Sequence, residues 1–203
     1  MLVTGIEEYN KKQVKLYLDG EFAFLLYKGE LSQYHIKEGE ELAEQTYRLL
    51  TEDVLVKRVR LRAMNLLTKR AYTEQGLRRK LREGGYPPFL EDNALAYVKS
   101  FGYINDESYA RDYIASLSGR YTTGVIAAKL KQKGISDDII SICMEEAQEE
   151  LREGNEELLY ELIRKKCRDG CPEEPRERAK LMRFLASKGF AIGEIRRALN
   201  NLT

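Results

Sequence analysis

The residues LREGGY at positions 81–86, LKQKGI at 130–135 and LASKGF at 185–190 repeat one pattern along the chain. Each has a leucine, a glycine four positions later and an apolar residue directly after that glycine. Glycine readily takes the left-handed conformation that ends a helix, and the apolar residue then packs back on the last helical turn. The pattern predicts three helices that end in the same way, at Gly85, Gly134 and Gly189.

The spacing of these glycines predicts tandem helical repeats. They lie 49 and 55 residues apart, and a small residue and a long apolar one follow each glycine nine and ten positions later. Self-similarity at this period is typical of helical units that bury their apolar faces on one another. Each unit has room for three short helices. We place the units at residues 52–102, 103–153 and 154–203, with helix breaks at Gly102 and Gly154.

The first 51 residues carry strand signals instead. Apolar residues alternate along 14–18, and Asp19-Gly20 suits a tight hairpin turn before the apolar run 21–26. Residues 3–9 supply a third strand, because an isolated two-stranded hairpin is marginal in water. We therefore expect a mainly α fold, an elongated curved array of three-helix repeats behind a small antiparallel sheet with a short helix. Deleting residues 1–50 is expected to leave the repeats folded.

The composition excludes several classes of protein. The chain has 203 residues, 34 Lys and Arg against 33 Asp and Glu, and a net charge of +1. The longest apolar run, at 22–27, has six residues, so we expect no membrane span or signal peptide. Three cysteines at uneven spacing do not form a disulfide framework, which indicates a reducing cytoplasm.

Residues that could carry catalysis are sparse. His35 is the only histidine, so a histidine triad or a multi-histidine metal site has nothing to build on. Cys167 and Cys171 lack a second cysteine pair or a nearby histidine. Gly119 and Gly124 have the glycine spacing of a phosphate-binding P-loop, but the Lys and the Ser or Thr that should follow are missing. We expect no enzyme activity, no cofactor and no metal.

Charge is distributed very unevenly. Residues 57–82 hold ten basic side chains and one acid, a net charge of +9, whereas residues 137–157 hold nine acids and one base, a net charge of −8. Solvated helices usually interleave both signs, so we interpret the basic stretch as a surface for phosphates or an acidic partner, with a plain solvated face as the alternative. We assign to this surface Arg58, Arg62, Lys69, Arg70, Arg78, Arg79, Lys80 and Arg82, and in the second unit Arg120, Lys129, Lys131 and Lys133.

The connection between the first two units reads Phe101-Gly102-Tyr103-Ile104-Asn105-Asp106 and leads to Tyr109-Ala110. Gly102 should end a helix, Tyr103 and Ile104 should pack at the junction, and Asn105 or Asp106 should cap the next helix. Two more phrases stand in order around it: Leu77-x3-Leu81 after Arg70-x-Tyr72-Thr73, and Gly124-x-Ile126-x3-Leu130-x3-Gly134-Ile135. Together they resemble the RecX family, small bacterial regulators of the RecA recombinase. The residues that carry the resemblance are Gly102, Tyr103, Asp106, Tyr109, Ala110, Gly124, Leu130 and Gly134.

The resemblance implies a regulator without catalytic chemistry. Its helical array would lie in the groove of the RecA filament on single-stranded DNA and hinder ATP turnover, strand exchange and filament growth in recombination, DNA repair and the SOS response. It also implies weak direct binding of single-stranded and duplex DNA, and we expect a monomer without membrane contact. The alternative is an autonomous helix-turn-helix regulator of transcription. Against it, no helix groups the Arg, Asn, Gln and Ser side chains that read bases.

Overall fold

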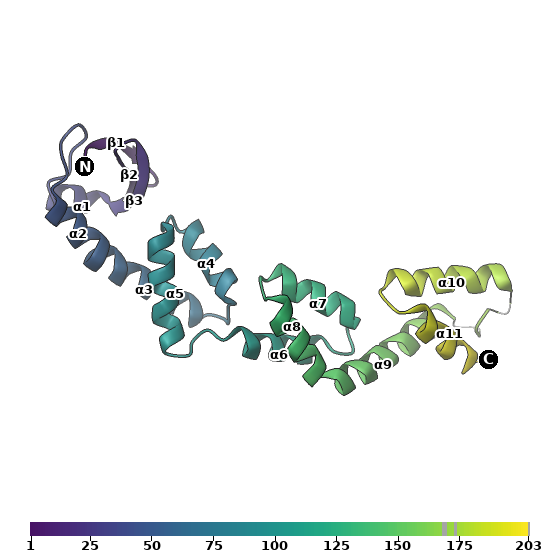
Figure 1. Cartoon of the computed structure of the whole chain (residues 1–203). Coiled ribbons are helices and arrows are strands. Elements are labelled where there is room, and N and C mark those ends of the chain that lie inside the picture. The colour runs from purple at the N-terminus through teal and green to yellow at the C-terminus, as the bar shows by residue number, and fades with distance from the viewer. Residues whose placement is uncertain (168–169, 173, 203) are drawn as a thin grey trace. The chain divides into compact units, whose positions relative to one another are not determined.

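The computed structural model describes residues 1–167, 170–172 and 174–202, which form two compact units, Met1–Asn105 and Asp106–Thr203 (Figure 1). The first unit holds β1 (Val3–Glu8), β2 (Gln13–Leu18), β3 (Glu21–Tyr27), α1 (Lys28–Gln33), α2 (Glu44–Arg48), the π-helical η1 (Leu49–Val54), α3 (Leu55–Leu67), α4 (Glu74–Glu83) and α5 (Pro88–Ser100). The second holds α6 (Asp106–Leu117), α7 (Thr123–Gln132), α8 (Asp137–Glu146), α9 (Gln148–Lys166), α10 (Pro175–Ser187) and α11 (Ile192–Asn200). The predicted class, mainly helical with a small antiparallel sheet in front, is confirmed.

The sheet is the predicted antiparallel meander. Its strand order is β1-β2-β3, and Leu16 on β2 pairs with Ile6 on β1 and Phe24 on β3. Asp19 and Gly20 have φ angles of 50° and 90°, as a tight hairpin turn with two left-handed residues requires. The turn signal in the sequence therefore located the hairpin correctly.

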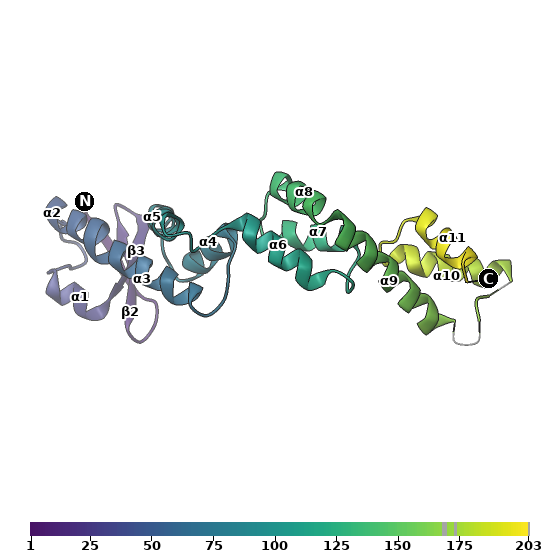
Figure 2. The same cartoon turned by 90° about the horizontal axis from the view of Figure 1, so that it is seen from below.

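The sheet and the first three-helix repeat share one hydrophobic core. Leu16, Phe24 and Leu26 of the sheet belong to the same buried cluster as Leu55 and Leu90 of the helices. α2, η1 and α3 also follow one another without a gap from Glu44 to Leu67, across the boundary that the sequence analysis placed at residue 52. The sheet lies against these helices in both views (Figure 1, Figure 2). The structure therefore contradicts the premise of the expectation that residues 1–50 are dispensable, namely that they are separate from the core of the first repeat.

The three predicted helix ends are confirmed. Gly85, Gly134 and Gly189 have φ angles of 79°, 84° and 98°. In each case the amide of the following residue donates a hydrogen bond to the carbonyl of the repeat's leucine, at 3.3, 3.3 and 3.4 Å. This is the Schellman arrangement, which satisfies the carbonyls at a helix C-terminus. Gly85 has a second constraint, because a Cβ atom there would lie 2.3 Å from Leu25 Cδ1 on β3.

The connecting phrase after α5 is only partly as predicted. Gly102 has a φ of 69°, and Tyr103 N donates a hydrogen bond to Val98 O at 3.0 Å, so Gly102 does end α5. Ile104 is buried, but Tyr103 is 52% exposed and its ring stacks on Phe101 with ring centroids 5.8 Å apart. The packing role assigned to Tyr103 is wrong. α6 begins at Asp106, as the capping signal indicated.

The motif residues that follow lie in the second unit. Ala110 and Leu130 are fully buried in its first core cluster, and Tyr109 packs against that cluster. Gly124 lies exposed near the start of α7, where nothing in the structure requires a glycine.

α9 joins the two repeats of the second unit. Leu151 at its start belongs to one core cluster and Leu159 and Ile163 to the next, and the helix extends from the second repeat to α10 and α11 (Figure 2). The predicted helix break at Gly154 is wrong, because Gly154 lies buried inside α9. A Cβ atom there would lie 2.6 Å from both Gly119 N and Ser118 Oγ. The glycine permits a close approach between chain segments rather than a break.

Two hydrogen-bonded contacts complete this junction. Thr122 Oγ1 donates to Lys188 O at 3.3 Å, directly before the helix-ending Gly189. Asn155 on α9 accepts from Thr123 N at 3.2 Å and its amide contacts Thr123 Oγ1 at 3.0 Å. The start of α7 is thereby attached to the third repeat.

We predict that deleting residues 1–50 unfolds the first unit. Full burial of one large apolar side chain contributes roughly 1.5–3 kcal/mol, and the deletion removes several, against a typical total stability of about 5–15 kcal/mol. Circular dichroism should show a loss of helix larger than the deleted residues account for, while the second unit still melts cooperatively. An unchanged melting profile of the remaining helices would contradict the shared core.

We predict opposite effects for two glycine substitutions in the second unit. Gly154→Ala should destabilise it by roughly 1–3 kcal/mol, because the added methyl group meets backbone atoms that cannot move aside. Gly124→Ala should stabilise it by up to about 1 kcal/mol, since that helical glycine has open space around it. Chemical denaturation of both variants measures the difference. Equal effects would show that the contact at Gly154 is not tight.

Candidate nucleic-acid interface

Arg58 does not belong to an exposed basic surface. Its side chain is 17% exposed, and its guanidinium forms an ion pair with Glu30, whose side chain is 13% exposed. The guanidinium also lies 3.4 Å from Leu25 O and 4.5 Å from the centre of the Tyr27 ring. Arg58 therefore joins α3 to the end of β3 and to α1, and its assignment to the binding surface is wrong.

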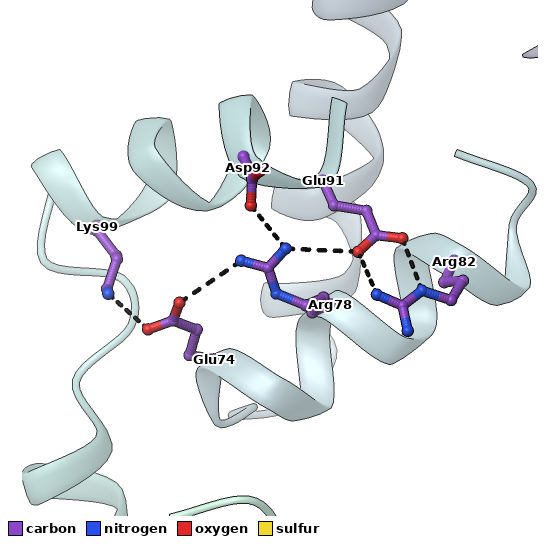
Figure 3. A network of polar contacts seen from close by, with 6 residues as sticks. All are labelled: Glu74, Arg78, Arg82, Glu91, Asp92 and Lys99. Atoms are coloured by element: carbon purple, nitrogen blue, oxygen red, sulfur yellow. Dashed lines mark hydrogen bonds and ion pairs between the residues drawn. The ribbon is translucent and has the colours of Figure 1, made fainter. Parts of the chain in front are cut away.

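Arg78 and Arg82 meet a buried carboxylate that the sequence analysis missed. Glu91, on the first turn of α5, has a side chain that is 0% exposed. Arg82 Nε and Nη2 donate to its two oxygens at 3.0 Å each, and Arg78 Nη1 lies 3.5 Å from the second oxygen (Figure 3). The hydrogen bonds to Glu91 raise the pKa of Arg82. No helical spacing connects these residues, so only the packing of α4 on α5 reveals the site.

The network extends from Arg78 to both sides. Arg78 Nη1 donates to Asp92 Oδ1 at 2.6 Å, which raises the pKa of Arg78, and Arg78 Nη2 lies 3.8 Å from Glu74. Lys99 Nζ lies 2.5 Å from the other oxygen of Glu74 (Figure 3). Arg78 is thus bound by carboxylates on several sides and keeps only 24% of its side chain exposed.

The basic stretch is therefore much less positive in three dimensions than in sequence. Lys57 pairs with Asp53 at 2.7 Å and Lys80 with Glu83 at 2.5 Å, in addition to the pairs of Arg58, Arg78 and Arg82. Within the described part of the chain, the assigned first-unit cations that remain exposed without a carboxylate partner are Arg62, Lys69, Arg70 and Arg79. We call these four the open cations of the first unit.

In the second unit, two of the assigned lysines lie over aromatic rings. Lys129 Nζ is 4.7 Å from the centre of the Tyr121 ring, and Lys133 Nζ is 5.0 Å from that of Tyr113. A cation over an aromatic face keeps its charge while its position is restrained. Lys131 instead pairs with Asp137 at 2.9 Å, and Arg120 is exposed. The charge of Lys131 is thus partly compensated, although its side chain stays exposed.

The described residues offer little for catalysis. They contain no group of three or more His, Cys, Asp or Glu side chains that could hold a metal ion. Cys167 lies at the C-terminus of α9, where burial and then the neighbouring Cys171 raise the pKa of its thiol. The thiol therefore stays protonated at neutral pH and is a weak nucleophile. No helix in the described ranges is both long and apolar enough to cross a membrane.

Tandem three-helix units with exposed cations define a modular helical protein. Models of the first, second and third three-helix domains of RecX match residues 60–97, 105–144 and 155–199. A protein of Limosilactobacillus reuteri named "Regulatory protein RecX" is 30% identical over 93% of this chain and 72% of its own length. The chain belongs to the RecX family of regulatory proteins.

One other relative and one solved structure match nearly the whole chain, and a second solved structure matches most of it. The "Regulatory protein RecX" of Caldanaerobacter subterraneus subsp. tengcongensis is 28% identical over 98% of this chain and 99% of its own. A solved structure described as regulatory protein RecX matches with a TM-score of 0.65 at 24% identity over 98% of both chains. RecX from Lactobacillus salivarius matches with a TM-score of 0.62 at 22% identity over 73% of this chain and 97% of its own. These two structures share the fold.

We predict that replacing the open cations of the first unit weakens DNA binding, whereas replacing the paired Arg58 lowers stability. Replacing Arg62, Lys69 and Arg79 together by Gln should leave folding intact and lower the slope of log K against log salt for single-stranded DNA by about 2, from roughly 0.7 per phosphate contact. Arg58→Gln should instead destabilise the unit by roughly 1–3 kcal/mol, because Glu30 loses its partner. Fluorescence anisotropy and thermal melting measure the two effects. An unchanged salt slope in the triple variant would show that the open cations do not contact DNA.

Proposed function

We propose that this protein is a non-catalytic regulator of the RecA recombinase. It binds the groove of the RecA filament on single-stranded DNA and inhibits ATP hydrolysis, strand exchange and filament growth, in recombination, DNA repair and the SOS response. The observation that carries the proposal is the match of all three RecX domain models, in order, along one chain. We further propose that the protein acts as a cytoplasmic monomer and binds naked DNA weakly.

The distribution of charge supports a filament as the target. The open cations of the first unit and the aromatic-held lysines of the second, Lys129 and Lys133, are small groups carried by separate repeats. A filament of protein on DNA offers phosphates and acidic protein surfaces at repeated intervals, so small groups of cations on successive repeats suit it. A protein that neutralises many phosphates of one DNA segment needs its cations together.

The ion pairs made by the arginines of α4 argue against an autonomous protein that recognises a base sequence in duplex DNA. Base recognition in the major groove depends on arginine, asparagine and glutamine side chains free to pair with base edges. α4 carries three arginines, yet Arg78 and Arg82 are bound to carboxylates, and Arg79 is the one arginine of this helix without an ion pair among the described residues. Such a helix contacts a phosphate backbone more readily than base edges.

We predict that this protein lowers the single-stranded-DNA-dependent ATP hydrolysis of its cognate RecA, because a protein lying in the groove hinders the subunit motions that turnover requires. The measurement is the steady-state hydrolysis rate at increasing ratios of this protein to RecA. The matched control is Gly124→Ala, which should inhibit as the wild type does. A hydrolysis rate that stays constant up to equimolar protein would contradict the proposal.

A binding comparison tests the same proposal independently. The affinity for RecA filaments formed on an oligonucleotide should exceed the affinity for the same oligonucleotide alone. Equal affinities would contradict the filament as target. A preferred duplex sequence would favour the transcription regulator instead.

A further inference from the structure

Glu91 is an unusual residue for the position it occupies. A carboxylate without solvent contact costs free energy unless cations and hydrogen bonds compensate it. Arg78 and Arg82 supply both, and the N-terminal turn of α5 adds the positive end of the helix dipole. The free-energy cost of burying the Glu91 carboxylate is therefore compensated. An apolar residue at position 91 could nevertheless have packed α4 on α5 at least as well.

The geometry of Arg82 indicates what the carboxylate does. Arg82 uses Nε and one hydrogen of Nη2 for Glu91, at 3.0 Å each, yet its side chain remains 65% exposed. A guanidinium has five N–H donors in a fixed plane. Glu91 leaves both hydrogens of Nη1 and the second of Nη2 unused, and one hydrogen from each of these two nitrogens forms a fork on the adjacent, terminal edge of the guanidinium. Glu91 thus holds the guanidinium plane through one edge, while the Arg82 side chain as a whole remains largely exposed (Figure 3).

A second cation lies one turn earlier on the same helix. Arg79 precedes Arg82 by three residues on α4, is exposed, and forms no ion pair among the described residues. The hydrogen bond from Lys80 and, to a smaller extent, the charge of Arg79 lower the pKa of Glu83. Residues three apart are neighbours on a helix surface. The other charges nearby cancel, since Arg78 pairs with Asp92 and Lys80 with Glu83. The pair formed by Arg79 and Arg82 therefore offers one uncompensated positive charge and a fixed donor fork.

We infer that Glu91 is a positioning residue that holds Arg82 ready to bind one backbone phosphate of single-stranded DNA, with Arg79 supplying the net charge. A phosphate oxygen pair matches the spacing of a guanidinium fork, which a lysine ammonium cannot reproduce. A mobile arginine loses side-chain freedom when it binds, whereas Arg82 has already lost it to Glu91. This inference rests on the proposed DNA-bound regulator and names one contact within it.

Two isosteric variants on α5 test the inference. Glu91→Gln and Asp92→Asn each remove one negative charge, and both residues contact Arg78, but only Glu91 contacts Arg82. Charge alone predicts that both variants bind a fluorescein-labelled thymidine oligonucleotide more tightly than the wild type. Positioning predicts that Glu91→Gln binds about tenfold more weakly, the effect of one lost charge-assisted contact, while Asp92→Asn binds at least as tightly as the wild type. Equal tightening in both variants overturns the inference.

The Arg82→Lys variant tests the inference even if Glu91→Gln does not fold. It retains the charge and a partner for Glu91 but loses the fork, so we expect several-fold weaker oligonucleotide binding at an unchanged salt slope. The control is Lys80→Arg, which adds a guanidinium on the same helix and should bind as the wild type does. Wild-type affinity in Arg82→Lys overturns the inference.

Two further comparisons distinguish a nucleic-acid backbone from free phosphate as the ligand, and distinguish a failure of this inference from a failure of the proposed function. Replacing chloride by inorganic phosphate at equal ionic strength should not displace the oligonucleotide, and displacement would overturn the assignment to a nucleic-acid backbone. If Glu91→Gln tightens DNA binding while the wild type still inhibits RecA, this inference fails and the proposed function stands. If the wild type leaves RecA unaffected while the variants differ as expected, the proposed function fails and the phosphate contact stands.

Discussion

A three-helix repeat of this size has little apolar surface with which to hold itself folded, and that constraint shapes both units. The domain matched at residues 60–97 has 38 residues, close to the size below which a chain usually needs a metal, disulfides or a partner. In the first unit the partner is the sheet, which contributes Leu16, Phe24 and Leu26 to the core of the repeat. In the second unit it is a neighbouring repeat, reached through the long helix α9. The glycine ends at Gly85 and Gly189 permit the close packing on which both solutions depend.

The features that sequence predicted correctly are those set by a few neighbouring residues. The Asp19-Gly20 hairpin and the three helix ends depend on the backbone preference of glycine and on one apolar contact nearby, and all of them stand where the sequence placed them. Helical periodicity likewise accounts for the burial of Val59 and Ala63 on one side of α3.

The incorrect expectations concern contacts between segments distant in sequence. Glycine is a residue type that often ends a helix, which is why the sequence predicts a break at Gly154. Its lack of a side chain instead lets α9 approach Ser118 and Gly119, which lie more than thirty residues away in sequence. Arg58 falls on the same helical stripe as Arg62, yet it turns to Glu30 on another element. Whether a glycine ends a helix or admits a neighbour, and whether an arginine is exposed or paired, is decided by the segment that packs against it.

The net charge of the basic stretch also depends on acidic side chains that approach it from elsewhere in the chain. A count along residues 57–82 finds ten cations and one acid, whereas Glu30, Asp53 and Glu91 approach the same surface from other turns and helices. Pairing therefore divides the cations into those that hold α3, α4 and α5 together and those that remain open. Because paired cations release few counterions, the salt dependence of DNA binding should report the open set alone. The affinity for a nucleic-acid backbone then depends on a few side chains, and the remaining basic residues contribute to the rigidity that keeps those few in place.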